Sequence, residues 1–202
     1  MTASTDSTAS TASSTSTAAT VSIRPAALAT LPGRELARPE LLALVRSLAS
    51  EPPWWRSHVS FSDERRHYVQ VHRDPHIDVW LLCWTPRNDT GWHDHDISSG
   101  AIAVVEGCLE EQVLTVGAPD NRRAVGAGQS YSFGPDHIHR LSGLDPGSVS
   151  VHAYSPPLWR LGQYTVSGAG LLRRTSVSYA DELRPIDEPF PDDQARLRDS
   201  LL

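Results

Sequence analysis

The sequence predicts an all-β barrel or sandwich that follows one short N-terminal helix. From about residue 66, short segments rich in β-branched and aromatic residues recur, and Gly, Pro, Asn and Asp separate them. Before these segments, one stretch has apolar residues at helical spacing. The chain has 202 residues, which is enough for one substantial core, so we expect a single domain.

The helix is expected within RPELLALVRSLASEPPWW, residues 38–55. Its apolar residues stand at positions 41, 42, 44, 45 and 48, which is the spacing of one helical face. Pro39 suits a first helical turn, where its missing N–H is not needed. Pro52 and Pro53 are expected to end the helix.

Nine later segments are expected to form strands. They are short, and Gly, Pro, Asn or Asp residues lie between them, as in antiparallel β proteins. The segments are RHYVQVH (66–72), HIDVWLLCW (76–84), AIAVVEG (101–107), LEEQVLTV (109–116), QSYSFG (129–134), HIHRLSG (137–143), GSVSVHAYS (147–155), LWRLGQYTV (158–166) and LLRRTSVSY (171–179).

The two ends of the chain differ in composition from the rest. Residues 1–21 are almost all Ser, Thr and Ala, which offer no apolar stripe to offset the entropy of ordering them. We expect a disordered tail there. Residues 181–202 are acidic and interrupted by proline, and we expect a peripheral arm. The domain itself is then expected within residues 22–180.

Composition and charge favour a small-molecule partner. The formal net charge is −6 and the basic residues form no run, which argues against a nucleic-acid surface built on phosphate contacts. No apolar stretch has the length of a membrane span or the pattern of a secretory signal. Cys83 and Cys108 lie in apolar segments and suit a reducing compartment. We expect a cytoplasmic monomer or small homo-oligomer that binds neither nucleic acid nor membrane.

Two pairs of histidines are spaced for metal binding. His93 and His95 stand two residues apart, and so do His137 and His139. Side chains two apart on a strand point the same way, so each pair can aim two imidazoles at one point. A pair of surface or hydrogen-bonded histidines is the alternative interpretation of each pair. The presence of both pairs favours a metal site.

The segment around the first pair resembles the first sequence motif of the cupins. In that motif, His-x-His precedes a glutamate ligand and then a glycine at fixed spacing. Here four residues separate His95 from Gly100, and six more separate Gly100 from Gly107. The spacing is kept, but Gly100 stands where cupins usually have the glutamate.

The segment around the second pair resembles the second cupin motif. Counting from Gly128 places Gly134 at the usual proline and His139 at the usual histidine. The resemblance implies a cupin-type, jelly-roll-like β-barrel. It also implies that His139, rather than His137, completes the metal site.

Within the cupins, the chain resembles the cysteine dioxygenase family of thiol dioxygenases over about residues 40–178. The first motif reads His-Asp-His, and Arg140 follows the third ligand, as is common in that family. The segment SVSVHAYSPP also carries the Ser-x-His-x-Tyr-Ser-Pro-Pro run of that family. The matching residues are Ser150, His152, Tyr154, Ser155, Pro156 and Pro157.

The resemblance implies an Fe(II) enzyme that inserts both atoms of O₂ into the sulfur of a small thiol. The thiol would be L-cysteine or 3-mercaptopropionate, and the product its sulfinate. Three neutral ligands would hold the iron: His93, His95 and His139. Tyr154 would donate a hydrogen bond to substrate or bound oxygen, and His152 and Ser150 would fix its hydroxyl. A solvated strand face is the alternative interpretation of these last three residues.

The sequence departs from the family pattern at two positions. Gly100 stands where mammalian members have a cysteine linked to the tyrosine, so no such crosslink is expected. Gln70 stands where cysteine-specific members have an arginine for the substrate carboxylate, and an amide cannot replace that bidentate cation. The candidate substrate contacts are Gln70, Arg140 and Arg160, of which Arg160 is the candidate carboxylate anchor. The alternative is that Arg160 is a solvated strand residue and that another group holds cysteine as the substrate.

Two other functions remain open. A non-catalytic cupin that binds a small ligand would need no redox metal. A metal-dependent cupin isomerase or decarboxylase would use similar ligands, although such enzymes usually keep the glutamate that Gly100 replaces. Neither alternative explains the run of Ser150, His152 and Tyr154.

Overall fold

The computed structural model of the chain describes residues 25–115, 117–166 and 172–178. The expected N-terminal tail (1–21) and acidic arm (181–202) lie outside the described residues. No helix in the described part is long and apolar enough to cross a membrane. Cys83 and Cys108 are free thiols.

The described part of the chain is mainly β-structure. One α-helix, α1 (Arg38–Ser50), lies between two short 3₁₀ helices, η1 (Ala26–Thr30) and η2 (Trp54–His58). The strands that follow are β1 (His67–Arg73), β2 (Asp78–Trp84), β3 (Trp92–Asp94), β4 (Ser99–Glu106), β5 (Cys108–Val113), β6 (Asn121–Gly126), β7 (Ser130–Phe133), β8 (His139–Gly143), β9 (Ser148–Ser155), β10 (Arg160–Val166) and β11 (Leu172–Ser178).

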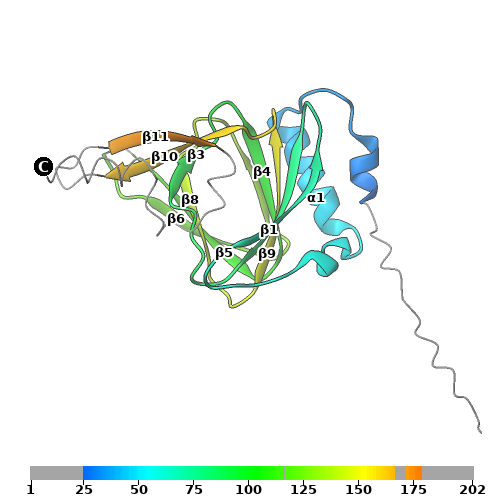
Figure 1. Cartoon of the computed structure of the whole chain (residues 1–202), viewed down its shortest axis with the longest axis horizontal. Helices are drawn as coiled ribbons and strands as arrows, with labels where there is room; N and C mark the ends of the chain where they lie inside the picture. Colours follow the sequence, from blue (N-terminus) through cyan, green and yellow to red (C-terminus); the bar gives the residue numbers. More distant parts are fainter. Residues whose placement is uncertain (1–24, 116, 167–171, 179–202) are drawn as a thin grey trace, which may run out of the picture.

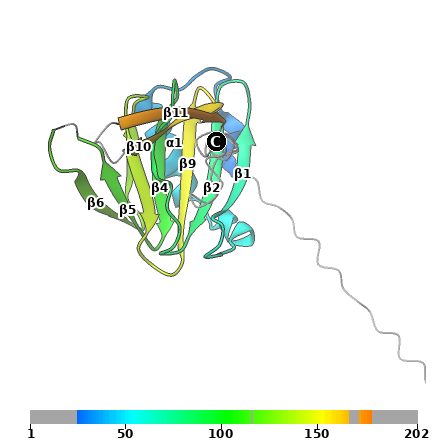
Figure 2. The ribbon, with the colours of Figure 1, turned by 60° about the vertical axis from the view of Figure 1, so that its left-hand side comes forward.

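The strands form two antiparallel sheets that face each other (Figure 1). One sheet has the order β1-β2-β9-β4-β7, and the other has the order β11-β10-β3-β8-β5-β6. Figure 2 shows β1, β2, β9 and β4 side by side, with α1 behind them. This arrangement confirms the predicted all-β, cupin-type fold with a short N-terminal helix.

Helix α1 covers the outer face of the five-stranded sheet. It begins where predicted, at Arg38 and Pro39, and the Glu40 carboxylate accepts a hydrogen bond from the Ala37 N–H at 2.9 Å. The helix ends at Ser50, and extended backbone follows at Glu51. Its apolar face is buried against the sheet and comprises Leu41, Leu44, Val45 and Leu48.

Strand β9 separates two cores because its side chains alternate. Val149, Val151 and Ala153 belong to the core shared with α1. Tyr154 belongs to the second core, which fills the interior between the two sheets and includes Trp84. The polar side chains of β9 therefore point into the barrel, as the sequence predicted, and not to solvent.

The structure differs from the strand prediction at three places. β6 was not among the predicted segments, because its first four residues are exposed and show no apolar alternation. β3 is only three residues long and was not among the predicted segments. β8 begins at His139, so His137 lies in the preceding turn and not, as expected, on the same strand. His95 likewise lies just past the end of β3.

A buried carboxylate joins β3 to β10 and β11. Asp94 accepts hydrogen bonds from Arg174 Nε at 2.7 Å, from Arg174 Nη2 at 2.8 Å, from Tyr164 Oη at 2.6 Å and from the Gly162 N–H at 3.0 Å. Burial raises the pKa of Asp94, but the bonds from Arg174 and Tyr164 outweigh it and hold that pKa at about 2. A Cβ at position 162 would lie 2.5 Å from the Asp94 carboxylate, so glycine is required there.

We expect Arg174→Leu to lower the free energy of unfolding by about 2 kcal/mol. The substitution removes the two charge-assisted hydrogen bonds from Arg174 and leaves the buried Asp94 carboxylate with fewer donors. Urea denaturation measures this change. Arg87→Leu is the control, because Arg87 and Asp63 are both exposed and lie 3.7 Å apart. Equal stability losses in the two variants would contradict the structural role of Asp94.

Candidate metal centre

Three buried histidines meet in the interior of the barrel. His93 lies on β3 and His139 opens β8, and the register of these two strands pairs them directly. His95 follows β3 and joins them. Their candidate ligand nitrogens all lie within 4.8 Å of one another, and each residue is at most 1% exposed. The structure thus brings together the three histidines that the sequence selected.

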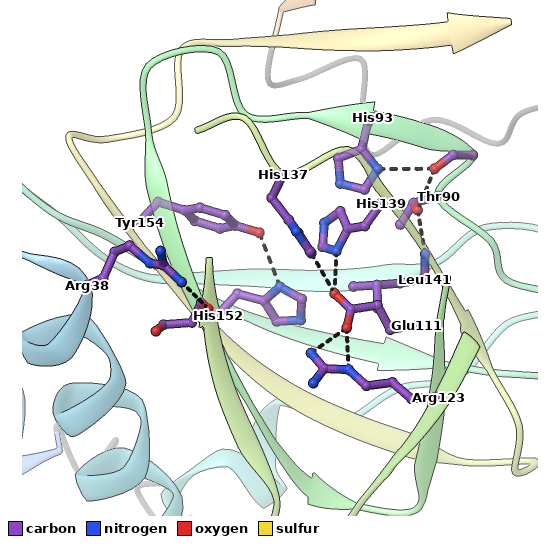
Figure 3. Close-up of polar contacts among 12 residues, drawn as sticks. Arg38, Thr90, His93, Glu111, Arg123, His137, His139, Leu141, His152 and Tyr154 are labelled. Atoms are coloured by element: carbon purple, nitrogen blue, oxygen red, sulfur yellow. Dashed lines mark hydrogen bonds and ion pairs between the residues drawn. The ribbon is translucent and has the colours of Figure 1, made fainter. Parts of the chain in front are cut away.

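Hydrogen bonding fixes which nitrogens face the cluster (Figure 3). His93 Nδ1 lies 3.1 Å from the Gly91 carbonyl oxygen, and His139 Nδ1 lies 2.9 Å from Glu111 Oε1. Both partners can only accept, so each Nδ1 carries a proton, and in a neutral ring the lone pair is then on Nε2. His139 Nε2 and both ring nitrogens of His95 are buried and have no hydrogen-bond partner among the described residues.

The unmet nitrogens suit a metal ion. Burial, and then the neighbouring histidines, lower the pKa of His95 well below its usual range. Burial also lowers the pKa of His139 to about 3, against the opposing effect of Glu111. The His95 and His139 imidazoles are therefore neutral near pH 7 and can offer lone pairs to a cation. Buried acceptors without partners are rare in proteins, so this donor set fits a bound divalent ion.

Glu111 on β5 orients the third histidine. It is fully buried, and Oε1 accepts from His139 Nδ1 and from His137 Nε2, each at 2.9 Å. Arg123 Nε donates to Oε2 at 2.6 Å. Burial raises the pKa of Glu111, but the histidine hydrogen bonds and the Arg123 charge outweigh burial and bring that pKa well below its usual range. An anionic carboxylate behind a ligating histidine fixes its tautomer and raises its basicity.

Glu111, His137 and His139 also lie close enough together to hold a metal. However, their polar atoms already bond one another, and Arg123 places a positive charge against the carboxylate. A cation there would have to displace these bonds and face a guanidinium. The cluster of His93, His95 and His139 is therefore the better candidate site.

The polar residues of β9 form a hydrogen-bonded chain beside this cluster, which we call the β9 relay. Ser150 Oγ lies 2.8 Å from His152 Nε2, and His152 Nδ1 lies 3.1 Å from Tyr154 Oη. All three side chains are buried. The Tyr154 ring lies against the His95 ring, with 5.1 Å between their centroids. The structure thus brings the relay to the three histidines.

Gly100 on β4 borders the same space. A Cβ at this position would lie 3.1 Å from Tyr154 Cδ1 and 2.3 Å from Phe133 Cζ. The Phe133 ring therefore occupies the volume that a side chain at position 100 would need. Phe133 also packs on the His95 and His139 rings, with centroid distances of 4.8 and 5.0 Å.

Of the three expected substrate contacts, Gln70 alone shares the interior face with the relay. Across β1, β2 and β9, its partners in register are Trp80 and His152. Gln70 Nε2 donates to Asp78 Oδ1 at 3.0 Å, which engages part of the amide. Asp78 is buried and pairs in register with Tyr154.

The structure places Arg140 and Arg160 away from the cluster. Arg140 follows the inward-facing His139, so it points to the opposite face of β8, where its Nε donates to Asp89. Arg160 is in phase with Gly162, which pairs with Asp94 on the outer face of β3, and its Nε lies 3.8 Å from Asp96. Alternation along the strands therefore argues against both expected substrate contacts.

Sequence reasoning missed two side chains beside the site. Glu111 is in phase with Leu109, so a charged residue within a buried alternation was the available signal. Gln163 pairs in register with His93 and shares its face of the sheet. That position follows from the pairing of β10 with β3, which the sequence does not specify.

A sequence profile of the family "Cysteine dioxygenase type I" matches residues 6–167. This match spans most of the chain. The chain belongs to the cysteine dioxygenase type I family. The family assignment confirms the resemblance found in the histidine and tyrosine motifs.

Curated relatives that this chain matches include vertebrate proteins. Human cysteine dioxygenase type 1 is 26% identical over 140 residues, which are 62% of this chain and 68% of the relative. The zebrafish (Danio rerio) cysteine dioxygenase type 1 is 28% identical over 134 residues, which are 58% of this chain and 65% of the relative.

Solved structures similar to this chain include KdgF from Halomonas sp., with a TM-score of 0.42 and 16% identity over 49% of this chain and 84% of KdgF. TT1209 from Thermus thermophilus has a TM-score of 0.45 and 13% identity, over 50% of this chain and 92% of TT1209.

We expect His139→Ala to abolish tight metal binding and His137→Ala to leave most of it. His139 Nε2 faces the cluster, whereas His137 Nε2 is used by Glu111. Anaerobic titration of each purified variant with Fe(II), or with Co(II) as a coloured probe, measures the affinity. If His137→Ala loses metal binding and His139→Ala keeps it, His137 and not His139 is the third ligand.

Proposed function

We propose that the chain is a non-haem iron thiol dioxygenase that converts a small carboxylated thiol and O₂ to the corresponding sulfinate. One observation carries the proposal. In a member of the cysteine dioxygenase type I family, a cluster of three buried histidines lies directly beside the buried β9 relay.

His93, His95 and His139 would hold the iron through the ring nitrogens that they bring together. Fe(II) bound there supplies the redox chemistry by which O₂ oxidises a thiolate to a sulfinate. All three ligands are neutral, and Gly100 provides no carboxylate. The positive charge of the site is therefore left to favour the thiolate over the thiol, so substrate binding releases the thiol proton.

Tyr154 would act on the substrate side of the cluster. Its ring lies against His95, and its hydroxyl is held by His152. A hydroxyl fixed in this way can donate a hydrogen bond to an oxygen that gains negative charge as the sulfinate forms. The buried position of the relay excludes water from that hydrogen bond and strengthens it.

A β-bulge supplies a candidate for the carboxylate anchor. Gln70 pairs with Trp80 and His72 with Val79, so Val71 is an extra residue in β1. The extra residue changes the phase of the strand. Arg73 therefore points to the same face as Gln70, although the two are three positions apart in the sequence.

Arg73 lies in one row with Asp78 and Tyr154 across β1, β2 and β9. Its Nη1 donates to Asp78 Oδ2 at 2.9 Å and its Nη2 donates to the Leu158 carbonyl at 3.0 Å. These bonds hold the guanidinium in place, with 34% of the side chain exposed. A fixed guanidinium in the Tyr154 row suits a substrate that carries a carboxylate next to its thiol. We assign to Arg73 the role first expected of Arg160.

The test of the function is turnover by the full-length Fe(II) protein. We expect O₂ consumption with 3-mercaptopropionate or L-cysteine and one sulfinate formed per O₂. Iron binding without O₂ consumption for any thiol would favour the non-catalytic alternative.

We expect Tyr154→Phe to retain iron but to lower sulfinate formation by roughly a hundredfold, because it removes one hydrogen-bond donor at the oxygen that gains negative charge. Unchanged formation would remove Tyr154 from the mechanism.

A second prediction concerns the substrate carboxylate. We expect Arg73→Gln to lower kcat/KM for 3-mercaptopropionate by about 10- to 100-fold, the loss of one charge-assisted hydrogen bond. Activity with the neutral 3-mercaptopropionamide should change little. Arg160→Gln is the matched control and should behave as wild type. If Arg73→Gln lowers kcat/KM for the acid and the amide equally, the arginine supports the fold and does not recognise the carboxylate.

A further inference from the structure

Trp84, at the end of β2, extends the β9 relay away from the metal cluster. Its indole Nε1–H donates to Ser150 Oγ at 2.8 Å. Its ring is fully buried and stacks on the His152 ring, with 6.2 Å between the centroids. The hydrogen-bonded chain therefore runs from Trp84 through Ser150 and His152 to Tyr154.

His152 can carry only one ring proton, so the chain must have a direction. Burial, and then the charge of Arg66, lower the pKa of His152 well below its usual range, which keeps the ring neutral. A neutral imidazole donates through one nitrogen and accepts through the other. Either Ser150 donates to Nε2 and Nδ1–H donates to Tyr154, or both hydrogen bonds run the opposite way.

The indole decides between these directions because it can only donate. Among the described residues, Ser150 Oγ bonds only Trp84 Nε1 and His152 Nε2. If His152 Nε2–H donated to Ser150, the serine proton would face an indole N–H and have no acceptor. If Ser150 donates to His152 Nε2, every proton of Trp84, Ser150 and His152 has an acceptor.

We propose that Trp84 is a positioning residue that sets the direction of the relay, so that His152 Nδ1–H donates to Tyr154 and the Tyr154 proton is directed to substrate. In the opposite direction, the Tyr154 hydroxyl would donate to His152 and could not donate to substrate with the same proton. The inference rests on the proposed function for its catalytic meaning, but the direction of the relay can be measured without turnover.

The first test is the tautomer of His152, read from side-chain ¹⁵N NMR of the full-length chain without added metal and with diamagnetic Zn(II). Signals are assigned by their loss in His152→Gln. We expect a protonated Nδ1 and a bare Nε2 in the wild type. In Trp84→Phe, the ratio of the two tautomers should fall by about tenfold or more, because the serine regains freedom to accept.

Trp54→Phe is the matched control. It also removes a buried indole hydrogen bond, from Trp54 Nε1 to the Leu48 carbonyl at 3.0 Å, but in the core shared with α1. His152 should keep its tautomer in this variant. If Trp84→Phe does not fold, benzothienylalanine introduced at Trp84 keeps the ring shape and replaces the N–H with sulfur.

The inference is overturned if the wild type protonates Nε2, or if loss of the indole N–H leaves the tautomer unchanged. A second measurement joins it to catalysis. Trp84→Phe should retain iron yet form less sulfinate per O₂, and the double variant with Tyr154→Phe should be no worse than Tyr154→Phe alone. If the wild type oxidises no thiol, the proposed function fails while the NMR result still decides the direction of the relay.

Discussion

The two-residue period of β9 is the constraint on which the rest of the structure depends. β9 lies between β2 and β4, and all eight of its residues are buried. One of its faces packs in the α1 core and the other lines the barrel interior. A slip of one residue would place His152 among valines and Val151 against the three clustered histidines. The mismatch on both faces therefore fixes the register of the sheet, and that register places the relay.

The same register brings together buried histidine nitrogens that have no hydrogen-bond partner among the described residues. Glu111 accepts from two histidines and one arginine, and the relay pairs its own hydroxyl and ring groups. These nitrogens are both ring nitrogens of His95 and His139 Nε2, none of which has a partner in the part of the chain that the structure describes. Buried acceptors without partners destabilise a fold, and here they gather where a bound cation would satisfy them. The site is thus preorganised at the expense of stability.

The sequence predicts what depends on periodicity and fails where strand pairing decides. Spacing and the resemblance to the family motifs together selected the three histidines and the relay, and in β9 residues two apart do share a face of the strand. The same rule, applied to Arg140 beside His139, would have placed that arginine outside. Glu111 and Trp84 gain their roles from partners on other strands, and Arg73 from a bulge. These features follow from register, which one sequence does not encode locally. Exposed β6 had no apolar pattern to detect.

The position of negative charge distinguishes this site from a cupin with a ligating carboxylate. Gly100 provides no side chain where cupins usually have a glutamate ligand. The Glu111 carboxylate instead hydrogen-bonds His139 Nδ1, so it lies next to a histidine of the cluster and outside the cluster itself. A carboxylate there strengthens His139 as a donor without occupying a coordination position. Arg123 offsets the carboxylate charge, so the cluster stays close to neutral before an ion binds. A divalent ion held by such a cluster keeps its positive charge for anionic ligands, which suits a thiolate better than a neutral alcohol or water.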